Sequence, residues 1–266
     1  MFFVAQIKKD FLWDFSYKIS FFGQFFGIIL TVFTFFFISR TFEDSTSTFL
    51  QEYGNNYFLF AIIGISLADL ITLSLRSATK SIREAQAFGY IDSLINSKIN
   101  PAHLVLCSML YPCIIGIIKI FLYFLTAKLF YDFQLSAFSS LIVIILSIFT
   151  LFSFLGLGFI AASFVLYFKQ GDPINFLISL VASALSGVLF PVSVLPEYLR
   201  NISELIPLTY GLDMIRKVVI YNSFENIDLQ DLTFMGVFSL IFLIGGILII
   251  KRTIYAIKLK GISGSY

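Results

Sequence analysis

Two charged residues, Asp69 and Lys119, lie inside long apolar stretches and are the first candidates for chemistry. A charge at the depth of a bilayer is costly, so it is a functional candidate by default, for example in a proton or substrate relay. At about 1.5 Å per residue, Asp69 lies roughly 18 Å from the outer end of its stretch, and Lys119 roughly 24 Å from the inner end of its own. We therefore expect different depths unless the helices tilt strongly. The alternatives to a relay are a local ion pair and solvation in a cavity.

The remaining reactive side chains form no recognisable site. Cys107 and Cys113 are spaced to face different sides of a helix, so neither a disulfide nor a shared metal is expected. His103, the single histidine, cannot complete a metal cluster with them. The sequence contains no Gly-x-x-x-x-Gly-Lys-Ser/Thr run that would cradle ATP, and no nucleophile beside a base. We predict no catalytic, cofactor-binding or metal site in this chain, which is therefore not expected to be an enzyme.

The composition places the chain in a membrane. Hydrophobic residues make up 58% and charged residues only 13%, whereas a soluble protein carries about 25% charged residues. The mean hydropathy is +0.92. The net charge of +2 gives no reason to expect a nucleic-acid partner. The 34 phenylalanines are interpreted as lipid-facing and inter-helix filler, with the lining of a substrate path as the alternative.

Six apolar segments have about the length that crosses a bilayer, which predicts an all-α integral membrane protein with one domain over residues 1–266. Lys and Arg gather at both termini and in segments 76–102 and 168–172, whereas the alternate loops carry Glu and Asp with neither Lys nor Arg. Because Lys and Arg favour the cytoplasmic side, both termini are predicted to be cytoplasmic, in a multi-pass protein of the cell inner (plasma) membrane. We expect the transmembrane helices at residues 19–38, 57–75, 104–125, 138–164, 173–189 and 232–250.

Residues 1–18 predict an amphipathic helix that lies in the membrane interface. Apolar residues recur at helical spacing opposite Lys8, Lys9 and Lys18, and Trp13 can anchor the helix at the head groups. The lysines come late and no small-residue cleavage site follows, which argues against a signal peptide. The alternative is a basic flank that only orients the first span.

The longest basic hydrophilic stretch, residues 76–102, follows the second apolar segment. Its composition predicts a helix over 79–88 that Gly89 stops. A second short helix is expected over 90–97, before the next span. The positive charge of this stretch places it in the cytoplasm.

Three prolines break the chain after the fifth apolar segment. Pro191, Pro196 and Pro207 each remove a backbone donor and clash with a continuing helix. Between and after them lie two short, half-polar helical pieces, which predicts a re-entrant extracellular helical hairpin over residues 190–217. Irregular backbone at this depth is tolerated only where protein or a water-lined cavity satisfies it. Three basic residues are expected outside, held near the interface by this hairpin: Arg200, Arg216 and Lys217.

The hairpin and the basic stretch resemble the signatures of the type-2 ATP-binding-cassette (ABC) exporter permeases. The family's hairpin pattern is a Gly, a Phe-Pro, a Leu-Pro, a Pro-Leu-Thr-Tyr and a terminal Arg. Those elements here are Gly187, Phe190-Pro191, Leu195-Pro196, Pro207-Leu208-Thr209-Tyr210 and Arg216. The family's basic-loop pattern of Ile-Arg-Glu, Gly-Thr-Leu-Glu and Pro is matched by Ile82-Arg83-Glu84, Gly89-Tyr90-Ile91-Asp92 and Pro101, with Asp92 replacing Glu and Tyr90 replacing Thr.

The resemblance covers nearly the whole chain and implies partners and site residues. It makes the basic stretch a coupling helix that sits in a cleft of a separate ATPase subunit, which would bind the ATP and Mg. It further implies a second permease copy, identical or related, with membrane lipids around both. The coupling residues would be Lys80, Ile82, Arg83, Glu84, Gly89 and Asp92. The hairpin residues would be Gly187, Phe190, Pro191, Pro196, Pro207, Tyr210, Asp213 and Arg216.

The function that the resemblance implies is that of the membrane-spanning permease of an ABC exporter. Its substrate would be hydrophobic or amphipathic: a drug, lipid, peptide or lipid-linked glycan. The polysaccharide branch commonly has an Arg-Tyr pair before its first span, whereas residues 15–18 here read Phe-Ser-Tyr-Lys. One alternative is a passive connector at 76–102. Another is an ion-coupled secondary transporter using Asp69 and Lys119, although no internal repeat is evident. A membrane-embedded lipid enzyme is disfavoured by the single histidine.

Overall fold

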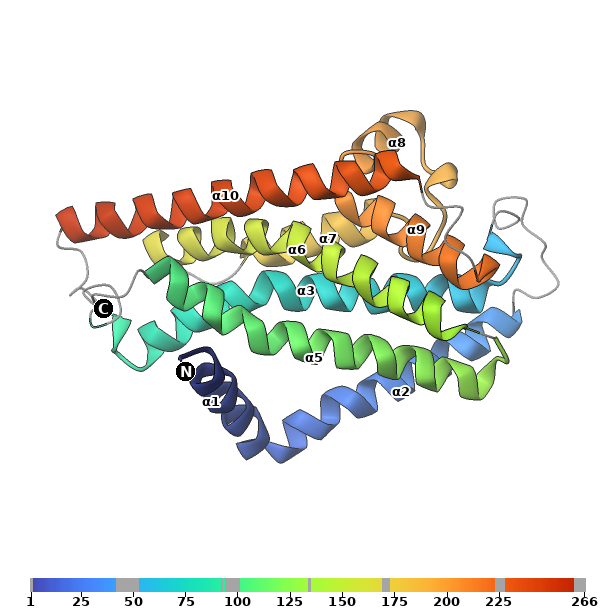
Figure 1. Ribbon diagram of the computed structural model, residues 1–266, viewed down its shortest axis with the longest axis horizontal. Coiled ribbons are helices and arrows are strands. Elements are labelled where there is room, and N and C mark those ends of the chain that lie inside the picture. Colours follow the sequence, from blue (N-terminus) through green and yellow to red (C-terminus); the bar gives the residue numbers. More distant parts are fainter. Residues whose placement is uncertain are drawn as a thin grey trace.

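The described residues fold into a bundle of α-helices (Figure 1). The computed structural model describes residues 2–41, 53–91, 93, 101–133, 135–168, 173–222 and 228–260, and these contain no strand. The helices are α1 Phe2–Ser16, α2 Lys18–Thr41, α3 Tyr57–Ala87, α5 Pro101–Phe130, α6 Ala137–Phe168, α7 Pro173–Leu185, the 3₁₀ turn η2 Val192–Val194, α8 Glu197–Ser203, α9 Pro207–Tyr221 and α10 Leu229–Lys260.

Five of these helices are long and apolar enough to cross a membrane: α2, α3, α5, α6 and α10. The fifth predicted span, 173–189, is only partly helical, because α7 ends at Leu185 after 13 residues. A helix of that length is roughly 20 Å long, whereas the hydrocarbon layer is about 30 Å thick. Alone, α7 is therefore too short to cross.

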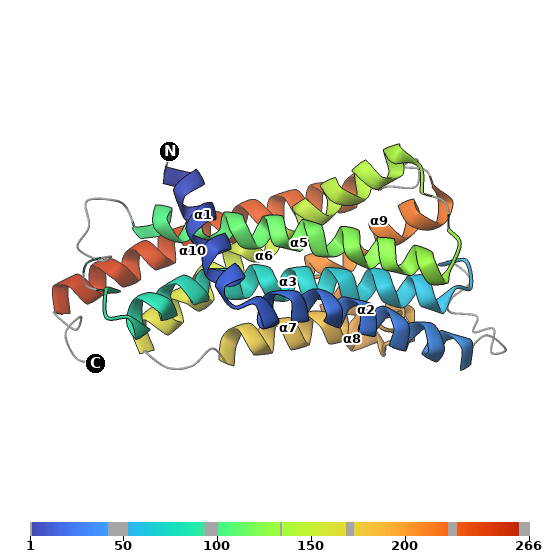
Figure 2. The same ribbon diagram turned by 90° about the horizontal axis from the view of Figure 1, so that it is seen from below.

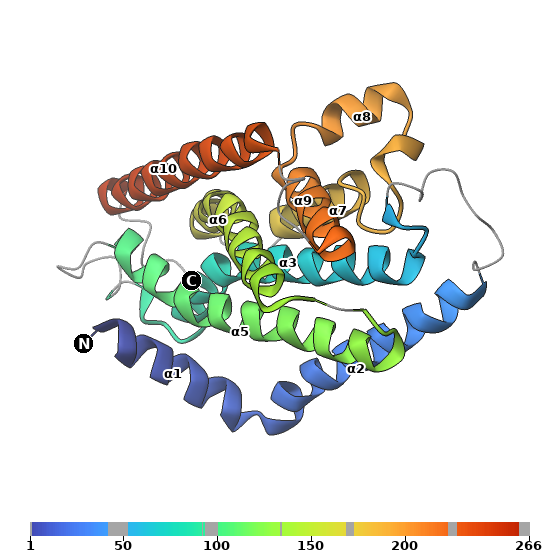
Figure 3. The same cartoon turned by 45° about the vertical axis from the view of Figure 1, so that its right-hand side comes forward.

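The central element of the bundle is α3. It packs against α2, α5, α6, α7 and α9, and 72% of its apolar stretch is buried, compared with 11% for α2 and 17% for α10. Figure 3 shows α3 between α5 on one side and α7 and α9 on the other. Any functional movement of the bundle must therefore involve α3.

The two helices expected at residues 57–75 and 79–88 form a single helix, because α3 continues without interruption to Ala87. The sequence between 76 and 87 holds no Gly or Pro to interrupt it. The extension also buries Ala78, Ile82 and Ala85 against the rest of the bundle. Gly89, with φ +71°, follows the helix end in a left-handed conformation that favours glycine.

The contact between α6 and α10 is the most extensive in the bundle. A methyl group at Gly156 would collide with the backbone of Phe242 and Leu243, and one at Gly246 would collide with the carbonyl oxygen of Gly156. The two helices thus approach backbone to backbone, as small residues allow in membranes.

Different helices lie at the two ends of the bundle. Figures 1 and 2 show the long helices running roughly along one axis, with α1 turned steeply away from α2. The carboxyl-terminal ends of α3 and α10 lie at the same end of the bundle as α1, whereas α8 and α9 lie at the opposite end. The amphipathic helix expected at residues 1–18 corresponds to α1, which packs against α5 and α2.

Candidate functional site

The broken segment after α7 consists of three short helices with a proline at or just before the start of each. Pro191 precedes η2, Pro196 precedes α8, and Pro207 is the first residue of α9. A proline fits there because the first helical N–H groups have no partner inside the helix. Gly187 has φ +81°, which takes the chain out of the α7 direction. Phe190, which lies between Gly187 and Pro191 in the sequence, is exposed.

Arg216 is the residue that holds this segment to the bundle. Its side chain is only 2% exposed, and its guanidinium donates to the carbonyl oxygens of Gly187 at 2.8 Å, Phe60 at 3.0 Å and Val188 at 3.1 Å. The guanidinium carbon also lies 3.4 Å from the centre of the Phe60 ring. Arg216 was expected on the outer side, held near the interface by the hairpin. The structure adds that its side chain is buried, because the carbonyls freed by the break after α7 need a donor.

Two further hairpin residues fix α9 to its neighbours. Asp213 forms an ion pair with Lys217 at 2.6 Å and accepts a hydrogen bond from the Tyr53 hydroxyl at 3.1 Å. The Tyr210 hydroxyl donates to the carbonyl oxygen of Glu204 at 2.7 Å. Its ring packs on Phe234 of α10, with centroids 4.7 Å apart.

Asp69 and Lys119 form an ion pair, with 3.2 Å between Lys119 Nζ and Asp69 Oδ2. The predicted difference in depth is wrong, because α5 extends to Phe130. Lys119 therefore lies roughly 17 Å from the outer end of α5, and Asp69 roughly 18 Å from the start of α3. The side chain of Lys119 is 13% exposed and that of Asp69 is 35% exposed, so the pair is partly open to solvent.

The ion pair lines a cavity of about 250 Å³ between α1, α2, α3 and α5. The residues of α3 that line this cavity include Asp69, Thr72, Arg76 and Lys80. These four lie along one face of the helix at spacings of three and four residues. That spacing was visible in the sequence. Arg76 was nevertheless interpreted only as the end of the second span.

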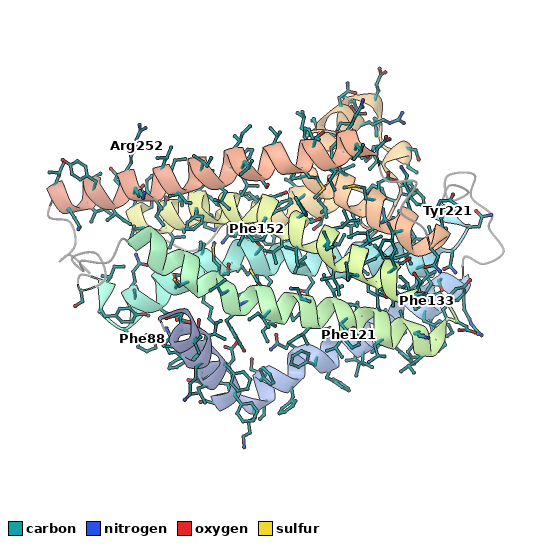
Figure 4. The ribbon with its side chains drawn as sticks, viewed as in Figure 1. Phe88, Phe121, Phe133, Phe152, Tyr221 and Arg252 are labelled. Atoms are coloured by element: carbon teal, nitrogen blue, oxygen red, sulfur yellow. The ribbon has the colours of Figure 1, made fainter. Side chains whose placement is uncertain are left out.

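The coupling candidates lie where the carboxyl-terminal end of α3 meets α1. Lys80 pairs with Asp14 at 3.4 Å and with Glu84 at 3.9 Å. Trp13 of α1 packs edge-on against Phe88, with ring centroids 5.7 Å apart. Figure 4 shows Phe88 beside α1. These contacts fix α1 against the last turns of α3.

The surface of this α1–α3 junction that faces away from the bundle is exposed and available to a partner. Ile82 is buried, whereas Arg83, Phe88, Gly89 and Tyr90 are exposed. Partial burial raises the pKa of the Tyr90 hydroxyl, and the negative charges of Glu84 and Asp10 act in the same direction. Asp92, the last coupling candidate, lies outside the described residues.

Buried polar contacts that the sequence did not predict connect α7 to α3. Asn175 is 2% exposed, and its amide nitrogen donates to the carbonyl oxygen of Leu75 at 3.1 Å and to Thr79 Oγ1 at 2.9 Å. The hydroxyls of Thr72 and Ser179 are 2.6 Å apart. The polar residues within the apolar pattern of α7 were the available signal.

Comparison with known proteins identifies the family. A search of the curated proteins finds no match. The family model described as ABC-2 type transporter matches residues 3–220, which is well over half of the 266 residues. The several apolar helices agree with an integral membrane protein. The chain belongs to the ABC-2 type transporter family and is a permease subunit of an ABC transporter, without an ATP-binding motif of its own.

Proposed function

We propose that this permease subunit moves a hydrophobic or amphipathic substrate out of the cytoplasm and is driven by a separate ATPase subunit. The ATPase would bind the ATP and Mg, since this chain has no phosphate-cradling loop. The substrate class follows from the apolar surroundings of any route between these helices. A second permease copy, identical or related, would complete the route.

The proposed topology has six crossings in the plasma membrane. Five crossings are the long helices α2, α3, α5, α6 and α10. The remaining crossing, the fifth in chain order, combines α7 with the segment η2–α9, which would re-enter the membrane from the outer side. Support comes from the packing of this segment against α3, α6 and α10 and from Arg216, which satisfies the backbone that the break exposes. With the end of α3 in the cytoplasm, both termini are cytoplasmic, as the distribution of Lys and Arg favours.

The observation that carries the proposal is the continuity of α3. This helix of 31 residues is roughly 46 Å long, so it passes through the bilayer and projects roughly 16 Å beyond the hydrocarbon. It ends at the exposed surface formed by Arg83, Phe88, Gly89 and Tyr90. A force applied there by an ATPase would act directly on the central helix of the bundle.

The test is co-purification with the ATPase subunit and stimulation of its ATP hydrolysis in reconstituted vesicles. Charge reversal in Arg83→Glu should weaken ATPase binding by at least about tenfold, because a like-charge contact across an interface costs several kcal/mol and each step of about 1.4 kcal/mol is a factor of ten. Lys258→Glu, an exposed cation near the end of α10, is the matched control. Both variants should retain the fold, since neither side chain is buried.

Two outcomes would contradict the proposal. The first is an ATPase that binds Arg83→Glu as tightly as it binds the unmodified chain. The second is a chain that purifies alone and moves solute in liposomes without ATP. The latter result would favour the ion-coupled alternative and make Asp69 and Lys119 the residues to test first.

A further inference from the structure

The cavity between α1, α2, α3 and α5 carries one positive charge more than it carries negative charges. Its charged lining consists of two carboxylates and three cations. Asp14 is paired with Lys80 at 3.4 Å, and Asp69 with Lys119 at 3.2 Å. Arg76 lies between Asp69 and Lys80 in the sequence of α3, is exposed, and makes neither an ion pair nor a side-chain hydrogen bond with the described residues. The excess charge of the cavity is therefore that of Arg76.

A second group in the same wall is unsatisfied. Tyr111 of α5 lines the cavity and is 5% exposed. Its hydroxyl is buried and makes no well-formed hydrogen bond within the described part of the chain. Its weak interaction is with the carboxylate of Asp14, which is already paired with Lys80. A buried hydroxyl without a partner costs about 1–3 kcal/mol. A ligand oxygen at this position would remove that cost.

The hydroxyls of α3 that line the cavity are already occupied. Thr72 donates to the carbonyl oxygen of Ala68, and Ser77 donates to that of Ser74. The free donors that the cavity offers on α3 and α5 are thus a guanidinium and a phenol. A guanidinium is a group suited to phosphate, to which it can donate two parallel hydrogen bonds.

The position of Arg76 in the bilayer indicates where the phosphate comes from. Arg76 lies roughly 28 Å along α3 from its first residue, Tyr57, which is close to the full thickness of the hydrocarbon, about 30 Å. In the proposed topology this is the level of the head groups of the cytoplasmic leaflet. A dissolved phosphate would have to reach a site with apolar walls, formed in part by Leu73, Pro112 and Ile115.

The size of the cavity fits a head group but not a whole lipid. Its volume of about 250 Å³ lies just below the range of roughly 300–1,000 Å³ that holds drug-sized molecules. The acyl chains would therefore remain outside. Both neighbouring helices present apolar surface for them, with Phe22 and Phe26 of α2 and Ile114 and Ile118 of α5 exposed.

We infer that this cavity binds the phosphate head group of an anionic lipid from the cytoplasmic leaflet, held by the Arg76 guanidinium and the Tyr111 hydroxyl. The lipid would fill the space between α1–α2 and α3–α5, next to the surface proposed to receive the ATPase. The inference rests on the proposed function only for the direction from which the lipid enters.

The test is lipid retention by the delipidated, purified chain, measured by native mass spectrometry. Phosphatidylglycerol and phosphatidylcholine with the same acyl chains are added separately. The unmodified chain should bind phosphatidylglycerol at least fivefold more tightly. Arg76→Gln should lose about tenfold in affinity for it, which corresponds to one charge-assisted hydrogen bond, and Tyr111→Phe about threefold.

The matched control is Arg252→Gln, which makes the same chemical change on α10, where the side chain points away from the bundle (Figure 4). It should bind phosphatidylglycerol as the unmodified chain does. Tyr111→Phe removes only a hydroxyl, so it tests the site even if Arg76→Gln folds poorly. Equal thermal melting of the variants checks the fold.

Three outcomes would overturn the inference. One is equal retention by Arg76→Gln, Tyr111→Phe and the unmodified chain, and another is equal retention of the two lipids. The third is displacement of the lipid by millimolar glycerol phosphate, which would assign the site to a soluble anion. None of these measurements uses the ATPase, so failure here is distinct from failure of the proposed coupling.

Discussion

Replacing Arg216 by Met should detach the broken segment η2–α9 from the rest of the bundle. Met keeps a long apolar side chain but removes the charge and every donor. The carbonyl oxygens of Phe60, Gly187 and Val188 would then lose the donor that reaches them at 2.8–3.1 Å. No water is expected to replace it, because Arg216 is only 2% exposed.

The magnitude follows from the number of bonds and their setting. The three carbonyls share the two N–H groups of Nη2, so we count two hydrogen bonds. Inter-helix hydrogen bonds in membranes average about 0.6 kcal/mol, whereas those to a charged group contribute about 1.5–3 kcal/mol, so about 1 kcal/mol is a lower bound. The cation on Phe60 adds up to about 2 kcal/mol when desolvated. Burial of the charge, and of an Nε–H without an acceptor, opposes these gains. We expect a net loss of about 2–4 kcal/mol, a factor of about 30 to 700 in the unfolding equilibrium.

The assay is reversible unfolding in mixed micelles with increasing dodecyl sulfate. The matched control is the next residue, in Lys217→Met, which breaks only the exposed pair with Asp213. Such a pair contributes about 0.5 kcal/mol or less. Proteolysis of intact vesicles from the outer side should also cleave between α7 and α9 faster in Arg216→Met, because the segment is no longer held.

A result in which Arg216→Met and Lys217→Met unfold at the same detergent fraction would refute this reasoning. It would mean that the carbonyls find other partners at no cost, so the guanidinium does not hold the segment. Arg216→Lys distinguishes charge from geometry. An ammonium can still donate to the carbonyls but cannot stack as a flat group on the Phe60 ring. An intermediate loss is therefore expected, and full stability would refute the contribution of stacking.

Two further perturbations test the packing of the long helices and the buried charges. Gly156→Ala should destabilise the chain by about 1–3 kcal/mol in the same assay, because its methyl group would collide with the backbone of Phe242. Gly245→Ala has open space around it and should be neutral or slightly stabilising; equal losses would contradict the close packing of α6 on α10. A double-mutant cycle with Asp69→Asn and Lys119→Met should give a coupling of about 1 kcal/mol, reduced because Asp69 is over a third exposed. No coupling would show that the two charges do not depend on each other.

The sequence predicted those features that depend on nearby residues. Hydropathy along the chain located the long apolar helices, because the free energy of placing a residue in lipid depends mainly on the type of that residue. The prolines at 191, 196 and 207 located the short helices, since a proline acts on its own helix. Both kinds of information are local, and neither requires knowledge of which helices touch.

The features that depend on tertiary contacts were missed or misplaced. The hairpin was expected to hold Arg216, but the sequence did not indicate through which contacts, because its partners are carbonyls from two other parts of the chain. Asp69 and Lys119 were placed at different depths because the third span was expected to end at residue 125, whereas α5 continues to Phe130. Counting both from the outer ends of α3 and α5 gives nearly equal depths.

The contacts along α3 indicate how movement at one face of the membrane would reach the other. Near its outer end, the carbonyl of Phe60 accepts from Arg216 of α9. Midway, the Thr72 hydroxyl bonds Ser179 of α7, and one turn further its backbone accepts from Asn175. A displacement of the cytoplasmic end of α3 must therefore either break these polar contacts or carry α7 and α9 with it. Breaking buried polar contacts costs more than tilting α2, whose apolar stretch is only 11% buried in the bundle. We expect α3, α7 and α9 to move together, so that a push from the ATPase would shift the outer segment as a unit.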